Sequence, residues 1–105
     1  MTRYAKRVDE NQADVVAEIR AALPEATVFD LSGSGKGIPD LLIGFNGGNY
    51  LVEIKDGSKP PSERKLTPAQ EALHTNWQGQ VAVANNSAEA IAAILRAVIR
   101  KGGKP

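Results

Sequence analysis

The strongest constraint on the fold is the stretch GIPDLLIGFNGGNYLVEIKDG, residues 37–57. It predicts a β-hairpin, because two apolar β-forming runs flank NGGN and consecutive glycines can adopt the positive φ angles that a type I′ turn requires. The runs LLIGF and YLV make both faces of the hairpin largely apolar, which is typical of the inner strands of a sheet. Charges are costly in such a place, yet Asp40 opens the first strand, and Glu53 and Lys55 end the second.

Hydrophobic periodicity and capping signals predict the remaining elements. An apolar stripe indicates a first helix that Pro24 ends. Thr67 and the TPAQ sequence that it opens are typical of a helix start, and Ser87 is expected to cap the last helix. The order α-β-β-β-α-β-α predicts a mixed sheet with helices packed on it. The expected ranges are helix 12–23, strands 26–31, 39–45 and 49–55, helix 67–77, strand 80–85 and a helix from 87.

Composition limits the classes of protein that the chain can represent. Its 105 residues suffice for one domain with a single core, with the ends 1–8 and 101–105 expected to be flexible. The net charge is +1, so attraction to nucleic acid would depend on local clustering of charge. There is no cysteine, which excludes disulfides and thiolate chemistry and is compatible with the cytoplasm. No run approaches the roughly 18 apolar residues of a membrane span, and no secretory signal is expected.

The hairpin predicts where its three charges lie. With the turn at Gly47-Gly48 or over Asn46–Asn49, Asp40 faces Lys55 across the hairpin. Opposed residues, and residues two apart in one strand, share a side of the sheet, so Asp40, Glu53 and Lys55 gather on one face. Two carboxylates held together repel unless a positive charge lies between them, and a hard cation such as Mg²⁺ takes oxygen ligands. The alternative is a cross-strand ion pair of Asp40 and Lys55, with Glu53 exposed at a sheet edge.

The chain resembles a known family at these positions. Pro39-Asp40 followed by Glu53-Ile54-Lys55 resembles the PD-(D/E)xK nuclease signature, and GKGIPDLLIG, YLVEIKDG and LTPAQ are similar to its VRR-NUC branch and to archaeal Holliday junction resolvases. The resemblance implies an α/β fold with a restriction-endonuclease-like αβββαβ core, a mixed four-stranded sheet flanked by helices, and one extra C-terminal helix. It also implies a metal-dependent, structure-specific DNA endonuclease that acts as a junction resolvase or a nicking enzyme.

The resemblance also implies roles for individual residues. Asp40, Glu53 and the main-chain carbonyl of Ile54 would ligate Mg²⁺ or Mn²⁺. Lys55 would orient or help to activate the attacking water and would stabilise charge on the phosphate. Gln70 matches the glutamine that these nucleases carry near the catalytic centre, and a capping-box role at its own helix start is an equal alternative.

The first helix departs from the family pattern. Family members often place a glutamate there as an extra metal ligand, whereas here the position is Gln12, with Asp9 on the same face. Either side chain could hold a metal-bound water, but a neutral glutamine lowers the charge available to a second metal. The departure therefore favours one metal over two.

Basic residues flank the motif on both sides. Lys36 precedes Asp40 in a glycine-rich loop, and Lys59, Arg64 and Lys65 follow Lys55. Singly, each is more often an ordinary solvated charge. As a group they predict a rim that binds the DNA backbone without reading its sequence. A second basic group, Arg3, Lys6 and Arg7, could form an arm of the same kind.

Partners and location follow from the resemblance. Compact stand-alone members of this branch are typical of bacteriophages, which implies the host cytoplasm as the location. Cleavage of two symmetrically related strands implies a homodimer, and the apolar last helix could form its interface or cover the sheet instead.

Several other motifs and residues allow interpretations that differ from a nuclease. SGSGKG, residues 32–37, is not a P-loop, because a glycine follows its lysine and a strand follows where a helix is required. His74 is expected at the helix surface or in a groove, and Trp77 in the core. A non-catalytic nucleic-acid-binding module on the same fold, and a protein-interaction domain with the charges as surface pairs, remain alternatives.

Overall fold

The computed structural model describes residues 11–100, and its elements follow the predicted order. The chain forms a mixed four-stranded sheet and three α-helices, with one short 3₁₀ turn in the loop before the second helix. None of the helices within residues 11–100 is long and apolar enough to cross a membrane. The elements are α1 (Gln12–Ala22), β1 (Thr27–Asp30), β2 (Leu41–Phe45), β3 (Gly48–Ile54), η1 (Pro61–Glu63), α2 (Pro68–Asn76), β4 (Gln80–Ala84) and α3 (Ser87–Arg100).

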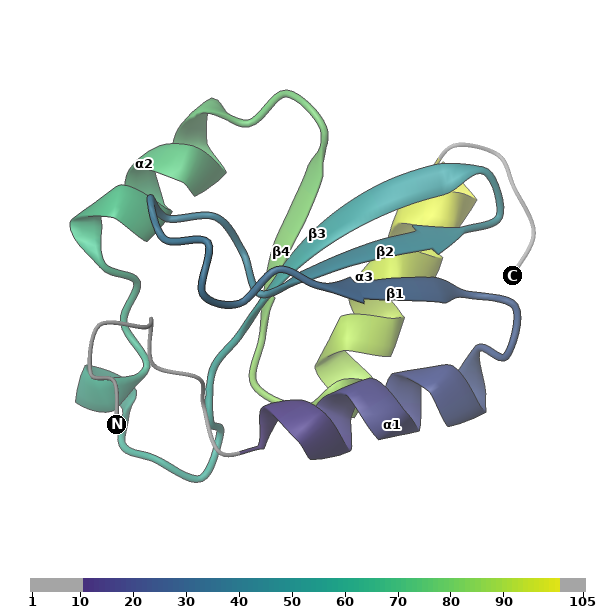
Figure 1. Ribbon diagram of the computed structural model, residues 1–105, viewed down its shortest axis with the longest axis horizontal. Helices are drawn as coiled ribbons and strands as arrows, with labels where there is room; N and C mark the ends of the chain where they lie inside the picture. The colour runs from purple at the N-terminus through teal and green to yellow at the C-terminus, as the bar shows by residue number, and fades with distance from the viewer. Residues whose placement is uncertain (1–10, 101–105) are drawn as a thin grey trace.

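The sheet places the hairpin at its centre. The strand order is β1-β2-β3-β4, so β2 and β3 are the inner strands, as their apolar sequences predict. The pairs β1–β2 and β2–β3 are antiparallel, whereas β4 runs parallel to β3. The parallel pair requires a crossover connection, which α2 and its loops provide (Figure 1).

The register of the hairpin differs from the predicted one by two positions. Asn46 and Gly47 form a two-residue turn with φ angles of 52° and 81°, the positive values of a type I′ turn. Leu41 therefore pairs with Val52, and extending the same ladder places Asp40 opposite Glu53 rather than opposite Lys55. A shift of two leaves every side chain on its predicted face. The prediction was wrong about the turn but correct about the faces.

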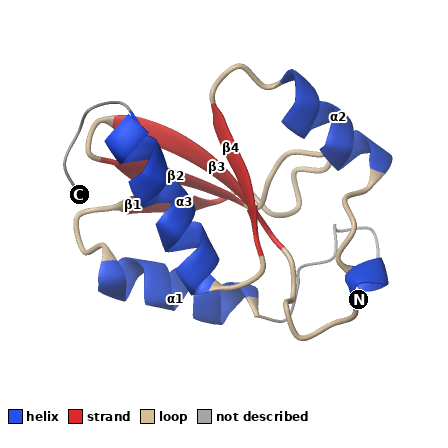
Figure 2. Cartoon of the chain, turned by 180° about the vertical axis from the view of Figure 1, so that it is seen from behind, coloured by secondary structure: helices blue, strands red, loops and turns tan. Residues whose placement is uncertain are grey.

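One face of the sheet is covered by α1 and α3 (Figure 2). Because Ile94 and Val98 are buried against the sheet and Ile99 stays 57% exposed, the last helix covers the core in this chain. Its cap is Asn86 rather than the predicted Ser87, since Asn86 Oδ1 accepts a hydrogen bond from the Glu89 N–H at 2.8 Å. The shared core consists of Val15, Ile19, Leu23, Val28, Leu41, Ile43, Tyr50, Val52, Ile54, Ala84, Ala90, Ile94, Ala97 and Val98.

The opposite face of the sheet is less well covered. In both views β4 lies between α3 and α2, so α2 belongs to the other side of the molecule (Figures 1 and 2). The cross-strand pairs align Phe29, Leu42, Leu51 and Val81 as one apolar row on this face. Of these four only Leu51 is buried, and Phe29 is 61% exposed. The charged residues of the hairpin share this more open side.

Candidate functional site

The two acidic residues of the motif are both buried. Asp40 directly precedes β2, Glu53 lies near the end of β3, and each is only 2% exposed. Oδ2 of Asp40 accepts a hydrogen bond from the Ile54 N–H at 2.8 Å, which fixes the Asp40 carboxylate beside the residue that follows Glu53. The alternative in which Glu53 is exposed at a sheet edge is therefore wrong, since Glu53 is buried on an inner strand.

Gln70 connects the acidic and basic parts of the site. Its Nε2 donates to Oε2 of Glu53 at 3.1 Å, and its Oε1 accepts from Nζ of Lys55 at 3.2 Å. Gln70 also completes a capping box, because its Oε1 accepts from the Thr67 N–H at 2.9 Å and its own N–H donates to Thr67 Oγ1 at 3.2 Å. The capping and site-contact roles, posed as alternatives from the sequence, are thus combined in one side chain.

The oxygen atoms of the site are of the kind that Mg²⁺ or Mn²⁺ binds. Two buried carboxyl groups that lie opposite each other in the extended β2–β3 ladder offer hard oxygen donors, and the Lys55 ammonium is held by Gln70. Within residues 11–100 there is no group of three or more His, Cys, Asp or Glu side chains arranged to hold a metal. Asp40 and Glu53 would therefore have to be supplemented by carbonyl or amide oxygens and by water.

Gln12, the extra metal ligand predicted in the first helix, contacts the carboxylate of Asp30. Gln12 is buried, and its Nε2 donates to Oδ1 of Asp30 at 3.3 Å. The Oε1 of Gln12 is also buried and accepts no hydrogen bond from the described part of the chain. Asp30, at the end of β1, was not singled out from the sequence, although its strand position next to Leu41 could have indicated it. Asp9 lies outside the described residues.

A second contact missed from the sequence fixes the start of α1. Nδ2 of Asn11 donates to the carbonyl oxygens of Lys55 and Asn85, each at 3.3 Å. This amide joins the end of β3 and the end of β4 to the first helix. It therefore helps to position the backbone of Lys55.

The basic residues of the predicted rim have different surroundings. Lys36 and Lys65 are exposed, whereas Lys59 and Arg64 are half-buried. Nε of Arg64 donates to the Lys59 carbonyl at 2.8 Å, so this guanidinium also holds its own loop together. The predicted basic arm, Arg3, Lys6 and Arg7, lies outside the described residues.

His74 lies one helical turn after Gln70 on α2. It is half-buried, as its predicted place at a helix surface or groove allows, and its Nε2 is buried without a hydrogen bond from any residue within 11–100. Burial, and secondly the nearby Lys55 charge, lower the pKa of His74 below its usual 6.5. His74 is therefore neutral at pH 7.

This lowered pKa predicts how stability depends on pH. Below about pH 6.5, His74 binds a proton in the unfolded chain more readily than in the folded chain. The free energy of unfolding therefore falls as the pH drops from 6.5 toward the pKa of His74 in the folded state. Urea unfolding of wild type and His74→Gln between pH 7.5 and 5 measures this slope, which we expect to be shallower in the variant. Equal pH slopes of the unfolding free energy in wild type and His74→Gln would contradict a lowered pKa of His74. The lowered pKa of Asp56, caused mainly by its hydrogen bonds from Ser58, acts in a separate window at and below about pH 3.8.

Gly37 fits the glycine-rich loop against α2. Its φ is +78°, and a Cβ at this position would lie 2.3 Å from the Ala69 carbonyl oxygen, in the turn that carries Gln70. Gly33 has a similar φ of +91° but open space around it, so it provides a matched control.

We expect Gly37→Ala to destabilise the fold by about 3 kcal/mol and Gly33→Ala by about 1 kcal/mol, because only the first adds a backbone clash to the left-handed strain. Urea unfolding of the two variants and wild type measures the difference. Equal losses would mean that the loop does not pack on α2 as described.

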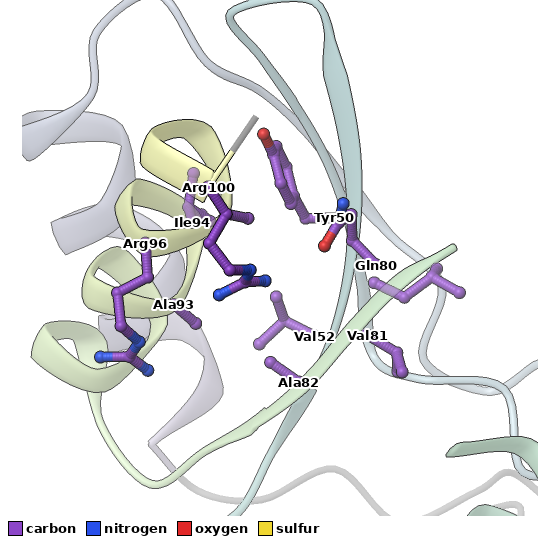
Figure 3. A pocket seen from close by; sticks show the side chains of 11 residues that line it. Tyr50, Val52, Gln80, Val81, Ala82, Ala93, Ile94, Arg96 and Arg100 are labelled. Carbon is purple, nitrogen blue, oxygen red and sulfur yellow. The ribbon is translucent and has the colours of Figure 1, made fainter. Parts of the chain in front are cut away.

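Trp77 and a hollow beside α3 differ from what the sequence predicts or singles out. Trp77 is 47% exposed, so its predicted place in the core was wrong. A hollow of about 220 Å³ lies between α3 and the β3–β4 edge, where Arg96 and Arg100 line it together with Tyr50 and Val52 (Figure 3). Since α3 covers the face opposite Asp40 and Glu53, this hollow is separate from the candidate site.

The geometry thus brings together Asp40, Glu53, Lys55 and Gln70, while Gln12 contacts Asp30 and the basic residues lie on the surrounding loops. The contacts of these residues are the basis for assigning a function. No protein-family model matches the chain, and neither a curated protein nor a solved structure matches it.

Proposed function

We propose that this chain is a divalent-metal-dependent DNA endonuclease with a restriction-endonuclease-like fold. The observation that supports this best is the buried pair Asp40 and Glu53, linked to Lys55 through Gln70. A buried pair of carboxylates is costly for a fold that needs only stability. This cost is offset where the pair holds a cation and a substrate phosphate.

The residues of the site would have different roles in phosphodiester hydrolysis. Asp40 and Glu53 would hold Mg²⁺ or Mn²⁺, with the Ile54 carbonyl as a further ligand. When bound, the ion polarises the scissile phosphate and the attacking water. Lys55, positioned by Gln70, would orient that water and balance the charge that develops on the phosphate oxygens. A single ion is expected, because Gln12 adds no charge for a second one.

Substrate binding would depend on the DNA backbone. Lys36 and the loop residues Lys59, Arg64 and Lys65 lie on the two segments that flank the motif, and contacts of this type are sensitive to salt and indifferent to sequence. We therefore expect recognition of DNA structure, such as a branch, flap or nick. One chain carries one such site, so cutting two strands symmetrically would need a homodimer. The cytoplasm, or the host cytoplasm for a phage-encoded chain, is the corresponding location.

Incubation of the purified chain with supercoiled plasmid in Mg²⁺ or Mn²⁺ tests the proposal. Nicked circles should appear in either metal and not in EDTA, and a panel of four-way junctions, flaps, nicks and duplexes would identify the preferred structure. Absence of cleavage in the whole panel would contradict the proposal and favour a non-catalytic nucleic-acid-binding module.

A further inference from the structure

Trp77, the only tryptophan of the chain, stands between two hollows at the end of α2. Its indole Nε1 lies close to Gly79, where an added Cβ would approach it to 2.8 Å. One hollow extends toward α2 and is lined by Lys36 and Leu73. The other, here named the Trp77 groove, lies over the open face of the sheet and is lined by Leu42, Gly47, Gly48, Asn49, Leu51, Trp77, Gln78, Gly79 and Gln80.

The Trp77 groove has the chemistry of a nucleobase site. It measures about 600 Å³ and combines apolar side chains, Leu42 and Leu51, with an exposed indole ring. The amide side chains Asn49 and Gln78 also line it and can both donate and accept hydrogen bonds. Flat aromatic rings with amides nearby stack on unpaired bases and bind their edges, whereas the bases of a continuous duplex stay stacked on one another.

Charge and position favour DNA as the occupant. Lys36 is exposed and lines, with Trp77, the hollow on the α2 side, where it can contact a phosphate of a strand whose base lies on Trp77. Gln70 lies in the first turn of α2 and Trp77 caps its C-terminal end, so their α-carbons are about 10 Å apart along the helix axis. A strand held at the catalytic site could therefore extend into the Trp77 groove.

We propose that Trp77 is a stacking platform for an unpaired base of the DNA substrate. The inference deepens the proposed function and, in naming DNA, depends on it. It narrows the substrate class to DNA with single-stranded character beside the cut, such as a flap or an open branch. Binding at the groove requires no catalysis, so the two proposals can fail separately.

Tryptophan fluorescence tests the platform directly, because Trp77 is the only indole in the chain. The full chain is titrated in EDTA with a 12-nucleotide oligothymidine and, separately, with a blunt 12-base-pair duplex. We expect saturable quenching by the oligothymidine and little change with the duplex. Emission that does not change as the oligothymidine binds, or no binding of it at all, would overturn the inference. Emission that changes with protein concentration but not with the oligothymidine would overturn it too, because it would indicate a second copy of the chain in the groove.

Substitutions of Trp77 test whether its indole ring binds the oligothymidine. By anisotropy of a labelled oligothymidine, Trp77→Ala should bind about tenfold more weakly, with Trp77→Phe in between. Ile99→Ala is the matched control, because Ile99 is 57% exposed on α3, and its affinity should equal that of wild type. The inference is overturned if Trp77→Phe binds the oligothymidine as tightly as wild type does and if folded Trp77→Ala, checked by its melting curve, does so too. Quenching without plasmid cleavage would contradict the nuclease alone, and cleavage without quenching would contradict the platform alone.

Discussion

Replacement of Asp40 by asparagine should reduce plasmid cleavage by about 10³-fold or more. Asparagine keeps the shape of the side chain and an oxygen that can accept from the Ile54 N–H, but it removes one of the two charges that would hold the cation. A bound cation contributes several kcal/mol of transition-state stabilisation, and each 1.36 kcal/mol is a factor of ten in rate. The measurement is the initial rate of nicking of supercoiled plasmid at saturating Mg²⁺.

Two controls make this result interpretable. Asp14→Asn is the same chemical change at an exposed position on α1 and should leave the rate unchanged. The melting temperature of metal-free Asp40→Asn should stay within a few degrees of wild type, which shows that the fold is retained. Cleavage by Asp40→Asn at the rate of Asp14→Asn would contradict the assignment of Asp40.

Divalent cations should stabilise the folded chain strongly. An ion that binds only the folded state at 100 times its Kd adds about 2.7 kcal/mol, which corresponds to a rise of about 10 °C or more in the Tm of a domain of this size. The cause is relief of the repulsion between the buried carboxylates of Asp40 and Glu53. Melting curves in EDTA and in increasing Mn²⁺ or Ca²⁺ measure the shift.

Two variants separate metal binding from catalysis in this experiment. Asp40→Asn should lose most of the shift, because it removes a proposed ligand. Lys55→Met should keep the shift but not the cleavage, because Lys55 contacts Gln70 and is proposed to act on the water and the phosphate. Identical melting of wild type in EDTA and in Mn²⁺ would contradict a metal role for the buried carboxylates.

Local sequence patterns were sufficient for the element order and for the sides of the sheet. Alternation along a strand has a period of two, so the sequence predicts Asp40 and Glu53 on one face even though the predicted register is wrong by two. The predicted register differs from the observed one because the prediction places Gly48 in the turn. Gly48 is instead in β3, where an added Cβ would clash with the Tyr50 ring, and the turn is formed by Asn46 and Gly47.

Contacts between distant segments could not be predicted in the same way. The capping box of Gln70 follows from four consecutive residues, whereas the Gln12–Asp30 and Asn11–Lys55 contacts depend on how α1 packs against the ends of the strands. Trp77 has the helical spacing of a core residue relative to Leu73. Periodicity identifies an apolar stripe without indicating whether another element covers it, and here Trp77 is half-exposed.

Diffraction near the manganese absorption edge, from crystals of the full chain soaked in Mn²⁺, tests the metal site most directly. A strong anomalous peak should lie within ligand distance of carboxylate oxygens from both Asp40 and Glu53. Well-ordered crystals with no peak between those two side chains, or with manganese bound only elsewhere, would contradict the proposed catalytic centre.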